Sequence, residues 1–213
     1  MSIRSILVAL LFVGTSLYCE GPKADRSFKV PMRDGYALDA DLFLPSGVKE
    51  PIPCLLIRSP RGKEVDSERF AKLTEWGYGV VLQDTRSRTA EGPQAMPYLT
   101  DGFGPLQDGY DTVEWLAAQD FCNGKVATIG ESALGITQLL MAPTAPPHLT
   151  CQYIQAGAPS LGRHILFPGG QFRKTQVEGW LTNYSDPQTF VHFVMSHMDD
   201  HAFWDSIDAT KVA

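Results

Sequence analysis

The chain has 213 residues, of which 44% are hydrophobic and 20% are charged, and its formal net charge is −6. This composition is typical of a globular domain with a substantial core, and it excludes a disordered chain. The longest run of basic residues is Arg173-Lys174, so neither a nucleic acid nor an anionic membrane surface is an expected partner. A small neutral or cationic substrate is compatible with this charge.

Residues 1–24 are predicted to be a signal peptide. Arg4 supplies the positive start, and residues 6–17 form an apolar segment too short to span a bilayer comfortably. The mature chain is therefore expected to be exported to the periplasm or the extracellular space, without a membrane span. Two alternatives stay open. The segment could be an uncleaved N-terminal anchor, because residues 16–24 hold no clean small-x-small cleavage site, or Cys19 could carry a lipid, although a bulky residue precedes it.

The four cysteines, Cys19, Cys54, Cys122 and Cys151, show neither a CxxC pair nor metal-ligand spacing. Cys54 and Cys151 lie in apolar runs typical of strands, so both are expected in the core. If Cys19 leaves with the signal peptide, three thiols remain, which allows at most one disulfide and leaves at least one free thiol. No metal and no cofactor are predicted.

Hydrophobic periodicity and turn residues predict strands that alternate with helices after an opening β-hairpin. The Asp34-Gly35 dipeptide is the expected hairpin turn. The expected elements are the hairpin over 28–44, strands over 52–57, 78–82, 126–129 and 150–156, and helices near 67–76, 109–118 and 133–141. This order predicts an α/β fold with a doubly wound, mostly parallel sheet, helices on both faces, and entry through an antiparallel hairpin.

The pattern changes after Gly157. Pro168-Gly169-Gly170 breaks the chain, and residues 172–184 and 189–198 carry aromatic and apolar side chains at helical spacings without strand alternation. We therefore expect a core over 25–160 and a mostly helical segment over 161–213, with the boundary near Ser160.

Ser132 is the candidate nucleophile of an acyl-transfer reaction. It lies in Gly130-Glu131-Ser132-Ala133-Leu134-Gly135, directly between a predicted strand and a predicted helix. In a strand–turn–helix elbow, a serine at this place projects its oxygen above the sheet, and the flanking small residues let strand and helix approach closely. The alternative is an ordinary loop or helix cap, and Leu134 departs from the commoner motif, which has glycine there.

Several motifs in the same order resemble the cocaine esterase and Xaa-Pro dipeptidyl-peptidase-like family of α/β-hydrolases, which includes α-amino-acid ester hydrolases and related acylases. The resemblance covers the chain from about Phe28 to its end, and its most specific block is residues 108–116 followed by 123–126 and the elbow. The other matching segments are 30–35, 56–60, 83–86 with Glu91-Gly92, 167–170 and Phe203-Trp204-Asp205. The last two resemble parts of the helical cap that this family inserts after the sixth strand.

The resemblance implies that Ser132 attacks an ester or amide carbonyl and that the backbone N–H of Ala133 donates to the oxyanion. The family has a tyrosine immediately after the serine, where this chain has Ala133. It also has a tyrosine donor to the oxyanion at the position of Arg61. The Arg61 guanidinium is the corresponding candidate donor.

In this fold the acid and the histidine of the triad follow the serine, on loops beyond the cap. The chain stops at Ala213, so we expect an incomplete domain that lacks the C-terminal half, with an unfinished cap and an exposed apolar edge at residues 150–156.

Two functions follow as hypotheses: the nucleophile-bearing part of a serine hydrolase for a small ester, amide or short peptide, or an inactive α/β-hydrolase-like remnant or binding module. A second copy of the chain, or a complementing C-terminal half, is a possible partner.

Several other polar residues are interpreted as structural rather than catalytic. His148 is predicted on a surface loop far from Ser132, and Glu131 at the junction of strand and helix. Asp108 and Asp111 are interpreted as caps at the start of a helix. The cluster of His192, His197 and His201 with Asp199 and Asp200 is interpreted as solvated cap residues rather than as a metal site.

Overall fold

The computed structural model describes residues 21–182, 184 and 187–211. Residues 1–20 of the predicted signal peptide therefore lie outside the described residues. Within the described part, no helix is both long enough and apolar enough to cross a membrane.

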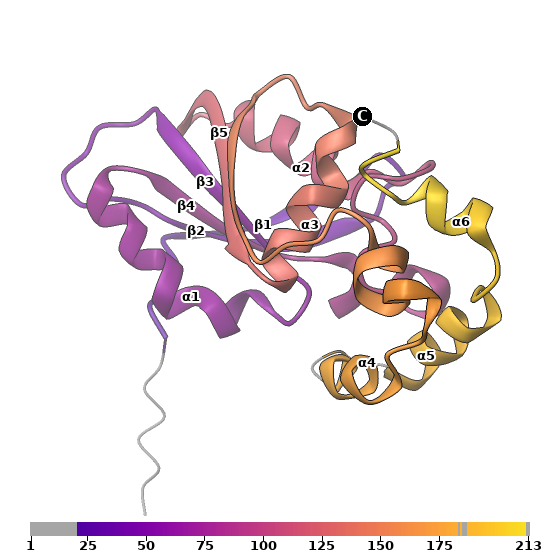
Figure 1. Cartoon of the computed structure of the whole chain (residues 1–213). Helices are drawn as coiled ribbons and strands as arrows, with labels where there is room; N and C mark the ends of the chain where they lie inside the picture. Colours follow the sequence, from indigo (N-terminus) through magenta and orange to yellow (C-terminus); the bar gives the residue numbers. More distant parts are fainter. Residues whose placement is uncertain (1–20, 183, 185–186, 212–213) are drawn as a thin grey trace, which may run out of the picture.

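A six-stranded mixed sheet forms the centre of the molecule (Figure 1), with the strand order β1-β2-β4-β3-β5-β6. Its strands are β1 (Arg26–Pro31), β2 (Ala37–Phe43), β3 (Ile52–Ser59), β4 (Gly79–Asp84), β5 (Cys122–Glu131) and β6 (Leu149–Gln155). β1, β2 and β4 pair antiparallel, whereas β4, β3, β5 and β6 pair parallel. The predicted hairpin and parallel α/β order are thus confirmed.

The hairpin follows from its turn residues and its alternation. Gly35 has a φ of 84°, which suits glycine, and the Asp34 carboxylate accepts a hydrogen bond from the Tyr36 N–H. Val30 pairs with Leu38 in the register, and both side chains are fully buried. A shift by one residue would turn these side chains to solvent, so burial determines the register.

Helices cover both faces of the sheet (Figure 1). α1 (Lys63–Ala71) lies on one face, where Phe70 packs with Ile57 and Leu82. α2 (Asp108–Ala117) and α3 (Ala133–Met141) lie on the other face, where Val113 and Met141 belong to one buried cluster with Leu56 and Val81. α1 begins four residues before the expected position, and its last turn continues as a 3₁₀ helix over Lys72–Trp76.

The residues after β6 form a separate helical group beside the sheet (Figure 1). It contains the π-helix η5 (Leu161–Leu166), α4 (Lys174–Leu181), α5 (Pro187–Ser196) and α6 (His201–Ser206). We call this group the cap. An apolar cluster joins it to α3, because Leu161, Val177 and Phe190 of the cap belong to the same buried cluster as Ala133 and Ile136.

Two sequence expectations are wrong. Cys151 is exposed, because β6 lies at the edge of the sheet and most of its residues face solvent. Asp108 and Asp111 are not helix caps: the residue before α2 is Gln107, without a side-chain capping bond. The Asp108 carboxylate instead pairs with Arg86, and the Asp111 carboxylate pairs with Arg33. Both carboxylates form ion pairs with arginines from distant segments, so neither accepts a hydrogen bond from the N–H groups at the start of the helix.

Candidate active site

Ser132 occupies a sharp turn between the carboxyl end of β5 and the first residue of α3. Its φ of 53° and ψ of −118° are unusual for a residue with a side chain. The Ser132 N–H donates to the Gln155 carbonyl over 2.9 Å, and the Ser132 carbonyl accepts from the N–H groups of Gly135 and Ile136. Hydrogen bonds on both sides of the residue therefore hold this strained conformation in place.

The glycines around Ser132 are required by close packing. A Cβ atom at Gly130 would lie 2.4 Å from the Cβ of Leu134, and one at Gly135 would lie 3.1 Å from Cγ2 of Ile154. Contacts below 3.0 Å are not tolerated without movement of the backbone or its neighbours. The expected role of these small residues, which is to let the strand and the helix approach, is confirmed.

Ala133 begins α3, and its side chain is buried. The first N–H groups of a helix lack intrahelical acceptors and carry the positive end of the helix dipole. Among the described residues, no acceptor hydrogen-bonds the Ala133 N–H, and no side chain hydrogen-bonds the Ser132 hydroxyl. Within the described part of the chain, both groups therefore lack a hydrogen-bond partner.

Arg61 follows β3 at the same edge of the sheet, where the carboxyl ends of the parallel strands lie. Its Nη2 donates to the Asp66 carboxylate at 3.3 Å, and its Nε is buried without a partner among the described residues. Burial raises the pKa of the Tyr98 and Tyr184 hydroxyls, and the nearby Arg61 charge acts in the opposite direction on both. Arg61 thus lies beside these two tyrosines, anchored by Asp66.

A cavity of about 350 Å³ opens over Ser132. Side chains of the cap form most of its wall, and the lining residues are Ser132, Ile136, Ala156, Ala158, His164, Ile165, Arg173, Gln176, Val177 and Trp180. We call this the Ser132 cavity. Arg61 is not among its lining residues.

Sequence reasoning did not single out His164 or Trp180 as site residues. His164 lies on the π-helix η5, an irregular helix type that is frequent at functional sites. Trp180 stacks on Tyr98 with a ring distance of 5.6 Å, and Tyr98 itself has a φ of 73°. In the sequence, the helical spacing of the aromatic residues predicted only that one helix face would be buried. Nothing in the sequence indicated that His164 and Trp180 would lie near Ser132.

The remaining polar candidates lie elsewhere. His148 is exposed, as expected, and its Nδ1 contacts Glu114 at 2.7 Å. Glu131 pairs with Arg69 at 2.6 Å. The His197 ring packs against Phe193 and Phe203, which also contact each other. Among the described residues, no three His, Cys, Asp or Glu side chains come together in a way that could hold a metal ion.

Comparison with known proteins shows the family. Residues 34–192 match the model of the X-Pro dipeptidyl-peptidase (S15) family. The chain belongs to this family. The match includes the hairpin turn, the elbow at Ser132 and the cap as far as residue 192, whereas Phe203-Trp204-Asp205 lies outside the matched residues.

The similar proteins are longer than this chain. Cocaine esterase from Rhodococcus sp. (strain MB1 Bresler) is 34% identical over 163 residues, which are 71% of this chain and 27% of that protein. A CocE/NonD family hydrolase from Staphylococcus aureus superposes with a TM-score of 0.68 at 21% identity, over 86% of this chain and 37% of that one. An α-amino-acid ester hydrolase superposes with a TM-score of 0.59 at 25% identity, over 88% and 39% of the two chains. The α/β-hydrolase fold and membership of a hydrolase family are thereby established, and the chain spans about a quarter of the curated relatives it matches.

Proposed function

We propose that this S15-family chain carries the nucleophile of a serine hydrolase that cleaves an ester or amide bond through an acyl-enzyme on Ser132. The observation that carries the proposal is the strained turn at Ser132, whose hydroxyl is free and faces a cavity. Strained backbone at a residue beside a cavity is a recurrent property of catalytic nucleophiles. The relatives' printed names, cocaine esterase and α-amino-acid ester hydrolase, agree with this chemistry.

In the proposed reaction, the Ser132 Oγ attacks the substrate carbonyl while its proton passes to a base, and the carbonyl oxygen becomes an oxyanion. The Ala133 N–H, with the N-terminal dipole of α3, stabilises that oxyanion. The acyl group remains on Ser132 when the alcohol or amine leaves, and water then releases the acid. His164 is the histidine that lines the Ser132 cavity, and among the described residues no carboxylate hydrogen-bonds its ring.

The cavity limits the substrate. Its volume of about 350 Å³ and the apolar side chains of Ile165, Val177 and Trp180 suit a small acyl group or the side chain of a short peptide. Arg173 and His164 add polar contacts at the wall.

The test is labelling with a fluorophosphonate probe, followed by peptide mapping. We expect the adduct on Ser132 and none in Ser132→Ala, whereas Ser67→Ala, which changes a half-buried serine of α1 outside the Ser132 cavity, should label like the parent chain. Because no acid–histidine pair faces Ser132 among the described residues, labelling should be slow. An adduct elsewhere, or the same labelling of Ser132→Ala, would refute the assignment. Absence of any adduct would favour the non-catalytic binding module.

We also propose that the chain is exported. The support is Arg4 followed by the apolar residues 6–17. Intact-mass measurement of protein from the native host should show the loss of roughly 18 to 25 N-terminal residues. A chain that retains residues 6–17 would contradict cleavage and favour the N-terminal anchor.

A further inference from the structure

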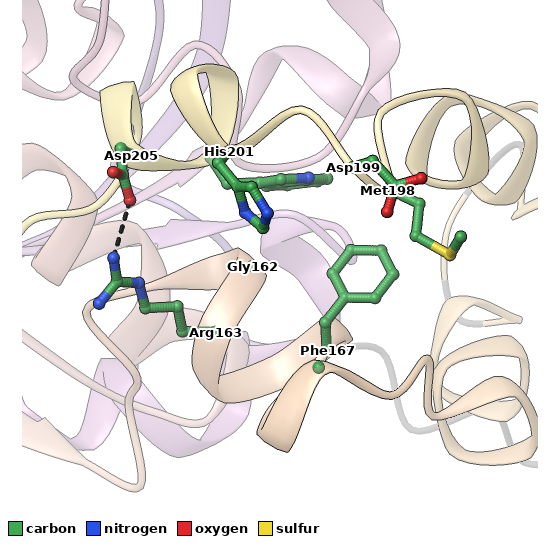
Figure 2. Close-up of a pocket in the computed structure, with 9 residues that line it drawn as sticks. Gly162, Arg163, Phe167, Met198, Asp199, His201 and Asp205 are labelled. Carbon is green, nitrogen blue, oxygen red and sulfur yellow. Dashed lines mark hydrogen bonds and ion pairs between the residues drawn. The ribbon is translucent and has the colours of Figure 1, made fainter.

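A second cavity, of about 500 Å³, lies between the π-helix η5 and α6 in the cap (Figure 2). It is lined by Gly162, Arg163, Phe167, Gly170, Met198, Asp199, His201, Trp204 and Asp205. It shares no lining residue with the Ser132 cavity. Its volume is within the range of small-molecule sites, and the proposed hydrolytic reaction does not use it. We call it the cap cavity.

Its apolar wall is held in a fixed geometry. Trp204 is buried, and its indole Nε1 donates to the His197 carbonyl over 2.6 Å. The Phe167 ring meets the Trp204 ring edge to face, with centroids 5.7 Å apart. Gly162 leaves room for the indole, since a Cβ atom there would lie 3.0 Å from Cγ of Trp204. The aromatic surface is therefore preformed and does not have to be ordered by a ligand.

The charges at the two ends of the cap cavity differ. At one end, Arg163 donates to Asp205 over 3.0 Å and lies 3.6 Å from Asp208. Lys211 donates to Asp205 from the other side, also over 3.0 Å. Two positive and two negative groups thus balance each other.

The other end carries an uncompensated negative charge. Figure 2 shows the Asp199 carboxylate beside Met198 and Phe167, away from the paired Arg163 and Asp205. Among the described residues, no cation and no hydrogen-bond donor contacts the Asp199 carboxylate. The cavity therefore combines an aromatic wall with one free carboxylate, and its single guanidinium is already neutralised.

We propose that the cap cavity binds an organic cation, that is, an amine or quaternary ammonium group attached to an apolar body. The cationic group would lie between the Asp199 carboxylate and the Phe167 ring, and the apolar body would pack on Met198 and Trp204. Aromatic faces attract such cations, and the attraction grows when water is displaced. An anion would instead meet Asp199 with no free positive group to hold it, apart from His201 in its protonated form.

The experiment uses the full chain and follows the indole N–H signals of its tryptophans by NMR during titration with benzyltrimethylammonium. The spectrum of Trp204→Phe identifies the signal of Trp204. We expect saturable movement of that signal with benzyltrimethylammonium, and weaker movement with benzyl alcohol and with phenylacetate, which are neutral and anionic probes. Equal binding of all three probes, or no saturable movement, would overturn the proposal.

Matched variants locate the interaction. Asp199→Asn, at an exposed position, should weaken binding about three- to fivefold, which is the scale of a partly solvated ion pair. Glu75→Gln removes an exposed carboxylate outside the cavity and should leave the affinity unchanged. Ser132→Ala should also bind normally, because the two cavities are separate. An unchanged affinity in Asp199→Asn, with native circular dichroism, would show that the carboxylate does not recognise the cation.

Discussion

Gly130 and Gly135 are the residues that permit the turn at Ser132. The contact of 2.4 Å that a Cβ atom at Gly130 would make is with the Cβ of Leu134. Leu134 is itself buried in one apolar cluster with Ile57 and Leu82. Leu134 has no space into which to move, so a larger residue at position 130 would displace the turn that carries Ser132.

We expect Gly130→Ala to lower the free energy of unfolding by about 1–3 kcal/mol, which is the usual cost of overpacking, and to reduce labelling of Ser132. Gly179→Ala is the matched control, because a Cβ atom at this exposed position of α4 meets nothing within 4 Å. It should stabilise the chain slightly, by up to about 1 kcal/mol from helix propensity. Urea denaturation measures both, and a neutral Gly130→Ala would contradict the packing argument.

Asp34 contributes stability that depends on pH. The hydrogen bond from the Arg86 guanidinium holds the pKa of this carboxyl below its ordinary value. The stabilisation is therefore present above the unfolded pKa, near pH 4, and is lost as the pH falls through the folded pKa. The unfolding free energy of the parent chain should decrease more steeply below about pH 4 than that of Asp34→Asn. Parallel pH profiles from urea titrations would show that the ion pair contributes nothing.

At the scale of elements, Arg86 joins three segments. Its side chain is fully buried, with hydrogen bonds to Asp34 of the hairpin turn and to Asp108 at the start of α2. Its guanidinium lies 4.6 Å from the centre of the Tyr36 ring. The hairpin, the loop after β4 and α2 are thereby fixed relative to one another, and this loop begins at the carboxyl edge of the sheet, where the β5 elbow also lies.

Removal of one carboxylate should be costly because it leaves part of a buried charge without its partner. We expect Asp108→Ala to lower the free energy of unfolding by about 3–5 kcal/mol. Asp39→Ala, which removes a carboxylate from the exposed pair with Lys29, should change it by less than about 1 kcal/mol. If calorimetry or urea denaturation found equal effects for the two variants, burial would not be the cause.

At the scale of the whole molecule, β6 is an edge strand. It pairs with β5 on one side, and no described strand pairs with its other side. Tyr153 on this strand is 58% exposed. Exposed strand edges with large apolar side chains favour pairing with another chain, so a second copy or a complementary segment of the hydrolase fold is the partner that we propose for this edge.

Self-association should accordingly increase with concentration, together with binding of a hydrophobic dye. Tyr153→Lys should reduce both, because lysine on an edge strand opposes pairing. Trp76→Lys changes an exposed aromatic residue outside the sheet and should reduce association less. Light scattering after size-exclusion chromatography measures the oligomeric state. A monomer at every concentration, without dye binding, would contradict the proposal.

The sequence by itself determined the features that depend on neighbours along the chain. Alternation predicted the hairpin, periodicity predicted the helices, and the strand–turn–helix context of Ser132 predicted the elbow that the structure confirms. These inferences succeeded because period, turn chemistry and residue size act within about ten residues.

The tertiary structure decided everything that depends on distant partners. Asp111 pairs with Arg33 across 78 positions, and Asp108 pairs with Arg86 across 22, so no local pattern could separate ion pairs from caps. Cys151 has the composition of a core residue, but its strand lies at an edge. His164 and Trp180 reach the Ser132 cavity only because the cap folds back onto α3 through a shared apolar cluster. Burial and charge pairing depend on which segments contact each other in the folded chain, and local sequence patterns do not predict those contacts.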